Sequence, residues 1–321
     1  MRLLRIFPDD SKFRFVRWRV LSFPFSAAIS VLTIVLFLTM GLNFGIDFTG
    51  GTLIEIQPKS GAADPGAVRT LARSFEVGDV EVQEIGSAGD ISVRFRTQPG
   101  GEAAQSALVQ RARAAFEKDF NIRRVETVGP RVSGELVQSG TLGVVLSIVA
   151  VLAYLWFRFE LQFAIGAIIG TLHDIVLTLG FFVITREEFN MTSIAAILTI
   201  VGYSLNETVV VFDRTRELLR KYKNLPTPEL LDLSINSTMS RTVMTATTTA
   251  LSLLALVLFG GQAIQGFANV MLYGVIICTY SAIFVSSPML IYLGVKTSAR
   301  AAADDKAAAA AKAAAISRRP A

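Results

Sequence analysis

The sequence predicts an α-helical membrane protein that carries one α/β domain outside the bilayer. Three observations support this fold class. Apolar residues make up 52% of the 321 residues and charged residues only 18%, with a mean hydropathy of +0.50, whereas soluble domains usually have about a quarter charged residues. Six stretches are long and apolar enough to cross a bilayer. The one long segment that separates two of them has the size and pattern of a folded domain.

Each of the six apolar stretches has roughly the 20 residues that a transmembrane helix needs. They cover residues 20–42, 137–157, 161–184, 191–212, 242–259 and 267–295. We expect the first to be an uncleaved anchor, because its apolar core exceeds that of a signal peptide and no small-residue cleavage site follows it. The single Cys278 lies in an apolar run, which excludes a disulfide-stapled secreted module.

The basic residues predict the orientation of these spans. They gather before span one, between spans two and three, between spans four and five, and after span six: Arg2, Arg5, Lys12, Arg14, Arg17, Arg19, Arg158, Arg214, Arg216, Arg220, Lys221, Lys223, Arg241, Lys296, Arg300, Lys306, Lys312, Arg318 and Arg319. If six spans alternate, all of these lie on one side, so both termini are expected to be cytoplasmic. The charge is then explained by topology and by anionic lipid headgroups, and no nucleic-acid partner is expected.

These spans divide the chain into five predicted parts. A basic cytoplasmic N-terminus covers residues 1–19, the first helix 20–42, a domain on the opposite side of the membrane 43–138, helices two to six 139–295, and an Ala-rich cytoplasmic tail 296–321. The segment 43–138 carries 11 basic and 13 acidic residues, so it is nearly neutral. It contains no His or Cys and no phosphate-binding glycine loop, and a binding or lever role is expected there rather than catalysis.

The pattern of this segment predicts the order β-α-β-β-α-β. Strands are expected at residues 52–57, 80–85, 91–97 and 122–128, and helices at 65–75 and 103–120. Asp64 and Pro65 suit the start of the first helix, and a Gly-Ser-Ala-Gly turn at residues 86–89 joins the two middle strands. This order is that of a ferredoxin-like sandwich.

Ionisable and polar residues inside the spans are the candidate functional residues, because they are costly in a bilayer. They are His173 and Asp174 in span three, Asn206 and Glu207 in span four, and Arg241 at the start of span five. A buried carboxylate such as Glu207 either stays protonated or finds a cation, and either state can be switched. Counted from the cytoplasmic ends, Glu207 and Arg241 lie at similar depths, which predicts an ion pair that protonation would release. Asp174 lies about two turns deeper and would communicate with Glu207 through water.

Structural explanations remain open for most of these residues. Arg241 is close enough to the cytoplasmic end to snorkel to the interface, and Asp213 and Arg214 can cap or anchor the end of span four. His173 can be a neutral hydrogen-bonding residue between helices. The hydroxyl-rich face after Arg241 can bond back to helix carbonyls or join neighbouring helices. That face consists of Thr242, Thr245, Thr247, Thr248, Thr249 and Ser252.

Several motifs resemble those of the SecF family of protein-translocase subunits, in order and over residues 21–295. Residues 45–51 read Gly-Ile-Asp-Phe-Thr-Gly-Gly and resemble the family signature Gly-x-Asp-Phe-x-Gly-Gly. Residues 128–136 resemble the segment before its second span, and His173-Asp174 the paired residues of its third. Residues 202–208 with 212–214, and 234–242, resemble its fourth and fifth spans. The family usually has Asp where this chain has Glu207, which is one methylene longer.

The resemblance implies half of a resistance-nodulation-division transporter in the bacterial inner membrane. It implies pairing with SecD, action with the SecYEG channel and indirectly with SecA on unfolded preprotein, and use of the proton-motive force without a bound cofactor. The proton pathway would include Glu207, Arg241, Asp174, His173 and Asn206. The residues of the family motif are Asp47, Gly50 and Gly51. We expect a hinge at Gly50 and Gly51, since adjacent glycines let a domain swing without side-chain clashes.

Two other classes of function are alternatives to this one. A small-molecule or lipid exporter subunit of the same superfamily would need a substrate cavity in its exported domain. An intramembrane protease would use Asp174 and Asp213, but no Gly-x-Gly-Asp or His-Glu-x-x-His motif accompanies them. The chain also has no Gly-x-x-x-x-Gly-Lys-Ser/Thr loop, so ATP hydrolysis and enzymatic activity are not expected.

Overall fold

The computed structural model describes residues 11–61, 63–85 and 89–297. Residues 86–88 of the predicted turn, the arginines at positions 2 and 5, and the Ala-rich tail from residue 298 lie outside the described residues. The chain forms two compact units. The sheet unit comprises Leu42–Ser147 and Arg186–Ala195, and the membrane unit comprises Met1–Gly41, Ile148–Thr185 and Ala196–Ala321.

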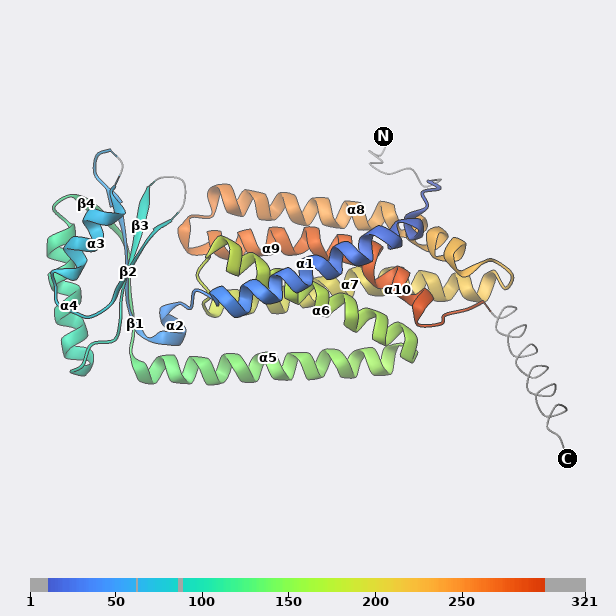
Figure 1. Cartoon of the computed structure of the whole chain (residues 1–321), viewed down its shortest axis with the longest axis horizontal. Coiled ribbons are helices and arrows are strands. Elements are labelled where there is room, and N and C mark those ends of the chain that lie inside the picture. The colour runs from blue at the N-terminus through green and yellow to red at the C-terminus, as the bar shows by residue number, and fades with distance from the viewer. Residues whose placement is uncertain (1–10, 62, 86–88, 298–321) are drawn as a thin grey trace, which may run out of the picture. The chain divides into compact units, whose positions relative to one another are not determined.

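The sheet unit contains four strands and two longer helices in the predicted order (Figure 1). Its elements are α2 (Ile46–Thr49), β1 (Gly51–Pro58), α3 (Pro65–Arg73), β2 (Val80–Ile85), β3 (Asp90–Phe95), α4 (Gly101–Phe116) and β4 (Phe120–Val128). All strand pairs are antiparallel, and the strand order in the sheet is β2-β3-β1-β4. The two strands at the centre, β1 and β3, are separated in the chain by a helix and a strand.

Local sequence explains these elements. The Asp64 side chain accepts a hydrogen bond from the Gly66 backbone N–H at 2.8 Å, and Pro65 occupies the first turn of α3, as expected for a helix start. Alternate residues of β1 enter one core with the buried side chains of α4. This core includes Ile54, Ile56, Val93, Phe95, Leu108 and Phe116, each fully buried.

The segment between the third and fourth membrane helices belongs to the sheet unit, which the sequence did not predict. Phe44 and Phe189 form a parallel bridge. Gly45 donates its backbone N–H to the Phe189 carbonyl at 2.8 Å, and Phe189 donates to the Asn43 carbonyl at 2.8 Å. The chain entering β1 is therefore fixed to Arg186–Ala195 by backbone hydrogen bonds.

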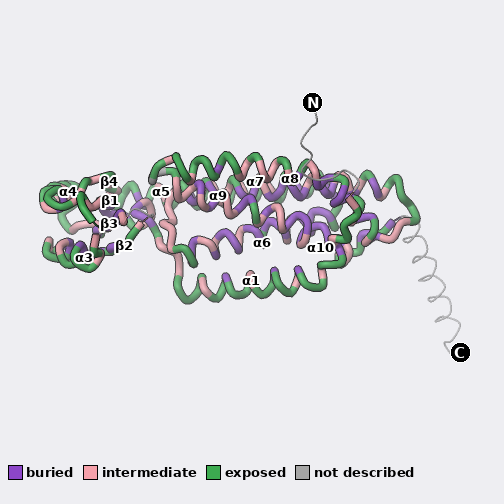
Figure 2. Tube along the Cα trace, turned by 90° about the horizontal axis from the view of Figure 1, so that it is seen from above, coloured by how far each residue is buried: buried purple, intermediate pink, exposed green. Residues whose placement is uncertain are grey.

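Within the described residues, six helices are long and apolar enough to cross a membrane, so the chain is a multi-pass membrane protein. The first five are α1 (Arg19–Met40) with the preceding turn η1 (Phe15–Trp18), α5 (Pro130–Arg158), α6 (Leu161–Thr185), α7 (Met191–Lys221) and α8 (Thr227–Phe259). The sixth is α9 (Gln262–Ser281), which continues through the π-helical turn η2 (Ala282–Ser286) into α10 (Ser287–Tyr292). Figure 2 shows that α6 is largely buried, whereas α1 is exposed along most of its length. Helix α5 is also mostly exposed.

Helices α5, α7 and α8 are longer than the sequence predicted. α5 begins seven residues before its predicted start, α7 continues nine residues beyond the predicted end of its span, and α8 begins 15 residues before its predicted start. Hydropathy marks only the apolar part of a helix, but the extensions of α7 and α8 are amphipathic and bury an apolar face. Leu218 of α7 and Leu230, Leu231 and Ile235 of α8 are at most 2% exposed.

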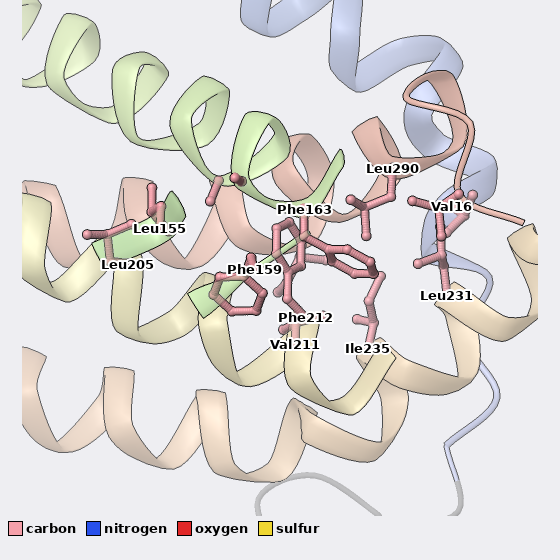
Figure 3. Close-up of a cluster of buried hydrophobic side chains, with 14 of the residues drawn as sticks. Val16, Leu155, Phe159, Phe163, Leu205, Val211, Phe212, Leu231, Ile235 and Leu290 are labelled. Atoms are coloured by element: carbon pink, nitrogen blue, oxygen red, sulfur yellow. The ribbon is translucent and has the colours of Figure 1, made fainter. Parts of the chain in front are cut away.

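The core of the membrane unit is an aromatic cluster close to the turn between α5 and α6 (Figure 3). The rings of Phe163 and Phe212 lie edge to face with centroids 5.4 Å apart, and Phe159 lies 6.1 Å from Phe212 in the same manner. Leu290 and Ile235 complete the cluster. It joins α6, α7, α8 and α10, and so fixes the helices that carry the polar residues.

Candidate functional site

Asp174 lies in the middle of α6 and is 1% exposed. The Ser204 hydroxyl of α7 donates a hydrogen bond to its Oδ2 atom at 2.6 Å. The Nδ1 atom of His173 lies 3.0 Å from Oδ1. A carboxylate can be buried when its oxygens are hydrogen-bonded, and here both are. Asp174 is therefore part of a small polar network that joins α6 to α7.

His173 is the second titratable member of this network. It is 8% exposed, its hydrogen bond goes to Asp174 on the same helix, and its Nε2 atom has no partner among the described residues. The alternative that His173 bonds between helices is not what the structure shows. An imidazole held through Nδ1 can gain or lose a proton at Nε2 without leaving the carboxylate.

Glu207 of α7 is buried, at 2% exposed, and its partner is a hydroxyl of α8. Thr245 Oγ1 donates to Glu207 Oε1 at 3.0 Å and also lies 3.0 Å from the Thr242 carbonyl oxygen. A hydroxyl has one hydrogen, so Thr245 donates to only one of these acceptors at a time. It can donate to an ionised Glu207, or accept a hydrogen bond from a protonated Glu207 while donating to the Thr242 carbonyl. The site accommodates both protonation states.

Helix α7 brings the two carboxylates into one polar zone. Ser204, which binds Asp174, precedes Glu207 by three residues and therefore lies about one turn away on the same side of the helix. Both residues are buried. Ser204 was not predicted as a functional residue, although its position three residues before Glu207 within the fourth-span motif was a usable signal.

Two predicted members of the proton pathway are not in this zone. Arg241 is exposed and forms no ion pair with Glu207 or any other described residue, so the predicted ion pair is not formed in this structure. Asn206 is also exposed. Successive helix residues point about 100° apart, and in each case the neighbour (Thr242 or Glu207) occupies the buried side instead.

The hydroxyl-rich face of α8 divides into two kinds of residue. Thr248 bonds to the carbonyls of Met244 and Thr245, and Ser252 bonds to that of Thr248, as the structural explanation predicted. Thr245 also reaches across to α7. Of Thr245, Thr248 and Ser252, only Thr245 therefore contacts Glu207, a candidate proton carrier.

The polar residues at the end of the fourth span act as anchors, as one of the open explanations proposed. Asp213 Oδ2 lies 2.5 Å from Arg158 Nη2, and its Oδ1 lies 3.6 Å from Arg216 Nη1. Arg214 donates to the Ser237 hydroxyl at 3.0 Å. Asp213 is thus paired with cations and does not lie in the network of Asp174.

In the sheet unit, Asp47 binds the start of α7. Its Oδ2 atom accepts a hydrogen bond from the Met191 backbone N–H at 2.9 Å. The first N–H groups of a helix have no partner within the helix and favour a negative charge nearby. The structure therefore gives Asp47 a definite contact that the motif alone did not predict.

Gly50 and Gly51 have positive φ angles of 69° and 120° at the start of β1. A Cβ atom on Gly51 would lie 2.2 Å from the Phe95 carbonyl oxygen of β3, and one on Gly50 would lie 2.7 Å from Thr97 Oγ1. Both positions therefore require glycine for steric reasons. The predicted hinge stays a prediction.

A charged cluster around Glu188 was not predicted. Glu188 Oε2 lies 3.4 Å from Arg94 Nη2, and Arg94 Nη1 lies 3.0 Å from Glu81 Oε2. Burial raises the pKa of Glu188, and the nearby positive charges of Arg94 and Arg124 oppose that change. Glu188 precedes the bridging Phe189, so the Glu188–Arg94 pair lies beside the backbone hydrogen bonds that join Arg186–Ala195 to the rest of the sheet unit.

Two family descriptions match the sequence. The one for the C-terminal part of the protein export membrane proteins SecD/SecF matches residues 108–296, and the one for the SecD/SecF GG motif matches residues 35–62. The first match includes Asp174 and Glu207, and the second includes Asp47, Gly50 and Gly51.

Relatives that match this chain over most of their own length point to the same family. The protein translocase subunit SecF of Rickettsia bellii is 40% identical over 294 residues, which cover 89% of this chain and 95% of the relative. SecF of Rhodobacter capsulatus is 38% identical over 307 residues, covering 91% and 92%. SecDF of Brucella abortus is 39% identical over 92% of this chain, but the chain spans only 39% of that longer protein.

A solved structure has the same fold. The crystal structure of SecDF from Thermus superposes with a TM-score of 0.80 at 30% sequence identity, covering 89% of this chain and 39% of the SecDF chain. SecDF in a super-membrane-facing form superposes with a TM-score of 0.60 over 94% of this chain. Together with the matches along the sequence, these similarities show that the chain belongs to the SecD/SecF family of protein export membrane proteins.

Proposed function

We propose that this chain is an accessory subunit of Sec-dependent protein export that uses the proton-motive force. The relatives that match it over most of their length are named translocase subunits, and this disfavours a small-molecule or lipid exporter. The observation that carries the proton-driven part of the proposal is the pair of buried carboxylates, Asp174 and Glu207, each hydrogen-bonded to a hydroxyl of another helix.

The proposed partner is SecD. In the Brucella and Thermus relatives, a segment similar to this chain forms 39% of a longer protein named SecDF. The present chain would then supply one half of a resistance-nodulation-division type assembly, and SecD the other. The assembly would act with the SecYEG channel, and indirectly with SecA, on unfolded preprotein.

The proposed location is the bacterial inner membrane, with both termini cytoplasmic and the sheet unit periplasmic. The distribution of basic residues supports this orientation. The order β2-β3-β1-β4, with the β-α-β-β-α-β chain order, supports a ferredoxin-like sandwich as the exported domain. A rigid sandwich of this kind suits a lever or a binding surface for polypeptide.

In the proposed proton step, Glu207 alternates between ionised and protonated states. When Glu207 is ionised, Thr245 donates to it. When it is protonated, Thr245 donates to the Thr242 carbonyl and accepts from Glu207. Moving one charge through the full membrane potential is worth about 2.3 kcal/mol per 100 mV, which is enough to bias two conformations of similar energy.

Asp174 and His173 would provide the next proton-binding site. Ser204 connects Asp174 to the turn of α7 that carries Glu207, and His173 can bind a proton at Nε2. Arg241 is exposed and not ion-paired with Glu207, but its positive charge acts on Glu207, and Asn206 would take part only from the exposed side of α7. No cofactor is proposed, since protons and hydroxyl groups suffice for this chemistry.

Helix α7 offers a mechanical connection. It carries Glu207, and its first backbone N–H is bonded to Asp47, which precedes β1. Glu207 follows Met191 by 16 positions, which corresponds to about 24 Å of rise along α7. We propose that a shift of α7 on protonation changes the Asp47 contact and so moves the start of β1.

The experiment is preprotein translocation into inverted inner-membrane vesicles that lack the chain but contain SecD and SecYEG. Adding back the chain is expected to increase the amount of fully translocated, protease-protected preprotein at late times. Vesicles that contain SecD and SecYEG but receive none of the chain serve as the control. Equal amounts of protected preprotein with and without the chain would contradict the proposed role in export.

A further inference from the structure

An open groove of about 530 Å³ runs beside the first membrane helix, within the membrane unit. Its walls are formed by the segment that precedes α1, the first two turns of α1, and residues of α9 and η2. Apart from Arg14 and Ser22, the lining is apolar or aromatic and includes Phe13, Phe15, Trp18, Leu21, Phe25 and Phe284. A volume of this size is typical of sites for small molecules.

The wall of the groove is held in place by hydrogen bonds and ring contacts. Ser22 donates its hydroxyl hydrogen to the Phe284 carbonyl at 3.0 Å, and the Ser26 and Tyr280 hydroxyls are 3.0 Å apart. The ring of Phe284 lies 6.0 Å from that of Phe15, edge to face, and 5.3 Å from that of Tyr280, stacked. The part of the groove formed by Phe15, Ser22, Tyr280 and Phe284 is thus held by these contacts.

The segment before α1 is fixed by α8. Asn236 accepts a hydrogen bond from the Phe13 backbone N–H at 3.1 Å and donates one to the Phe13 carbonyl at 2.8 Å. Asp232 accepts from the Val16 N–H at 2.8 Å. Arg14 lies between these two anchored residues, lines the groove and is exposed. It forms no ion pair with a described residue, but its positive charge acts on the nearby Asp232 carboxylate.

The groove therefore combines an apolar wall with a positive mouth. Trp18, Leu21 and Phe25 are 60%, 62% and 53% exposed at the start of a span, so they are open to the acyl chains of a bilayer. Lys12 and Arg14 lie before this span and Arg17 lies in its first turn, at the level of lipid phosphates. Large aromatic side chains also differ from the small residues that line close helix–helix contacts in membranes.

We propose that this groove binds an anionic phospholipid. One acyl chain lies along the aromatic wall, and the phosphate group contacts Arg14. The chemistry that recognises the ligand is the negative headgroup charge together with the apolar chain. The site does not use Glu207 or Asp174, and its test is independent of the proposed proton step.

The chain contains its own probes for a test. Its two tryptophans are Trp18, in the groove wall, and Trp156, which is 70% exposed near the end of α5. Trp156→Phe leaves Trp18 as the reporter of the groove, and Trp18→Phe leaves Trp156 as a matched reporter of the surrounding lipid. Each full-length variant is reconstituted into phosphatidylcholine vesicles that contain brominated phosphatidylglycerol or, separately, brominated phosphatidylcholine, and fluorescence quenching is measured.

Quenching of Trp18 should show a preference of at least about fivefold for phosphatidylglycerol over phosphatidylcholine, because one basic side chain near the bilayer surface contributes about 1 kcal/mol. Trp156 should show little preference, since the nearby Arg158 is paired with Asp213. Arg14→Gln in the Trp18 reporter should reduce the preference about fivefold. Arg220→Gln, which removes an exposed charge at the end of α7, should leave it unchanged.

Three results would overturn the proposal. Equal preferences at Trp18 and Trp156 would show that the groove attracts no particular lipid. Weak quenching of Trp18 by both brominated lipids would show that protein, rather than lipid, covers the groove. An undiminished preference in Arg14→Gln would show that the phosphate does not bind there.

Discussion

Replacing Gly51 by alanine tests whether the family motif is a steric requirement or a hinge. Gly51 begins β1 with a φ of 120°, and an added Cβ atom would lie 2.2 Å from the backbone carbonyl oxygen of Phe95. Because the obstacle is backbone within the same sheet, it cannot rotate away as a side chain would. The alanine variant must therefore shift β1 relative to β3 or lose pairing at its start.

The expected cost has two parts. A residue with a Cβ atom in a positive-φ conformation costs about 1–3 kcal/mol, and overpacking against fixed atoms costs about 1–3 kcal/mol more. Gly61→Ala is the matched control, because its φ is 70° and no atom lies within 4 Å of an added Cβ. The control variant should lose only the stability that the positive-φ conformation costs. Gly51→Ala should therefore lower the free energy of unfolding by about 1–3 kcal/mol more than Gly61→Ala does.

Hydrogen exchange with mass spectrometry measures this difference in the full-length chain. The backbone amides of β1 and β3 should exchange about 5- to 150-fold faster in Gly51→Ala than in Gly61→Ala, since 1.4 kcal/mol corresponds to a factor of ten. Equal protection of these strands in the two variants would refute the steric explanation. If export were lost while protection remained equal, the hinge hypothesis would be favoured instead.

Three further outcomes are expected. Thr245→Val should lower proton-gradient-dependent export severalfold in vesicles, because it removes the hydroxyl bonded to Glu207, whereas Thr248→Val should leave export unchanged. Arg158→Gln should reduce stability by less than about 1 kcal/mol in thermal unfolding, since its pairing with Asp213 is more than one-third exposed. Burial raises the pKa of Glu188, so its ionised form is disfavoured in the folded state. The melting temperature of the wild type should therefore rise as the pH falls from 7.5 toward 5. Glu188→Gln should show a smaller rise.

Much of the fold follows from local patterns in the sequence. The six spans follow from apolar length, because a membrane helix needs a continuous apolar run. The strands of the sheet unit follow from alternation, and the start of α3 from the Asp64–Pro65 pair. The carboxylates Asp174 and Glu207 were found because an ionisable residue in a span is rare and costly.

The remaining features depend on contacts between distant segments. Counting residues from the end of a span gives depth but not direction around the helix, so the Glu207–Arg241 pair was predicted while the hydroxyl of Thr245 binds Glu207. The same limit hid the link between Ser204 and Asp174. The pairing of Phe44 with Phe189 joins residues far apart in the chain, and no local sequence pattern predicts it.

Preprotein translocation with Glu207→Gln and a protonophore tests the central claim most directly. Inverted vesicles that contain wild type or Glu207→Gln are compared with and without the protonophore, after both assemblies have been shown to contain equal amounts of SecD. We expect the protonophore to lower late-stage translocation in the wild type and to have no further effect in Glu207→Gln. An equal loss in both would contradict the claim and would assign the proton step to another residue or to the partner subunit.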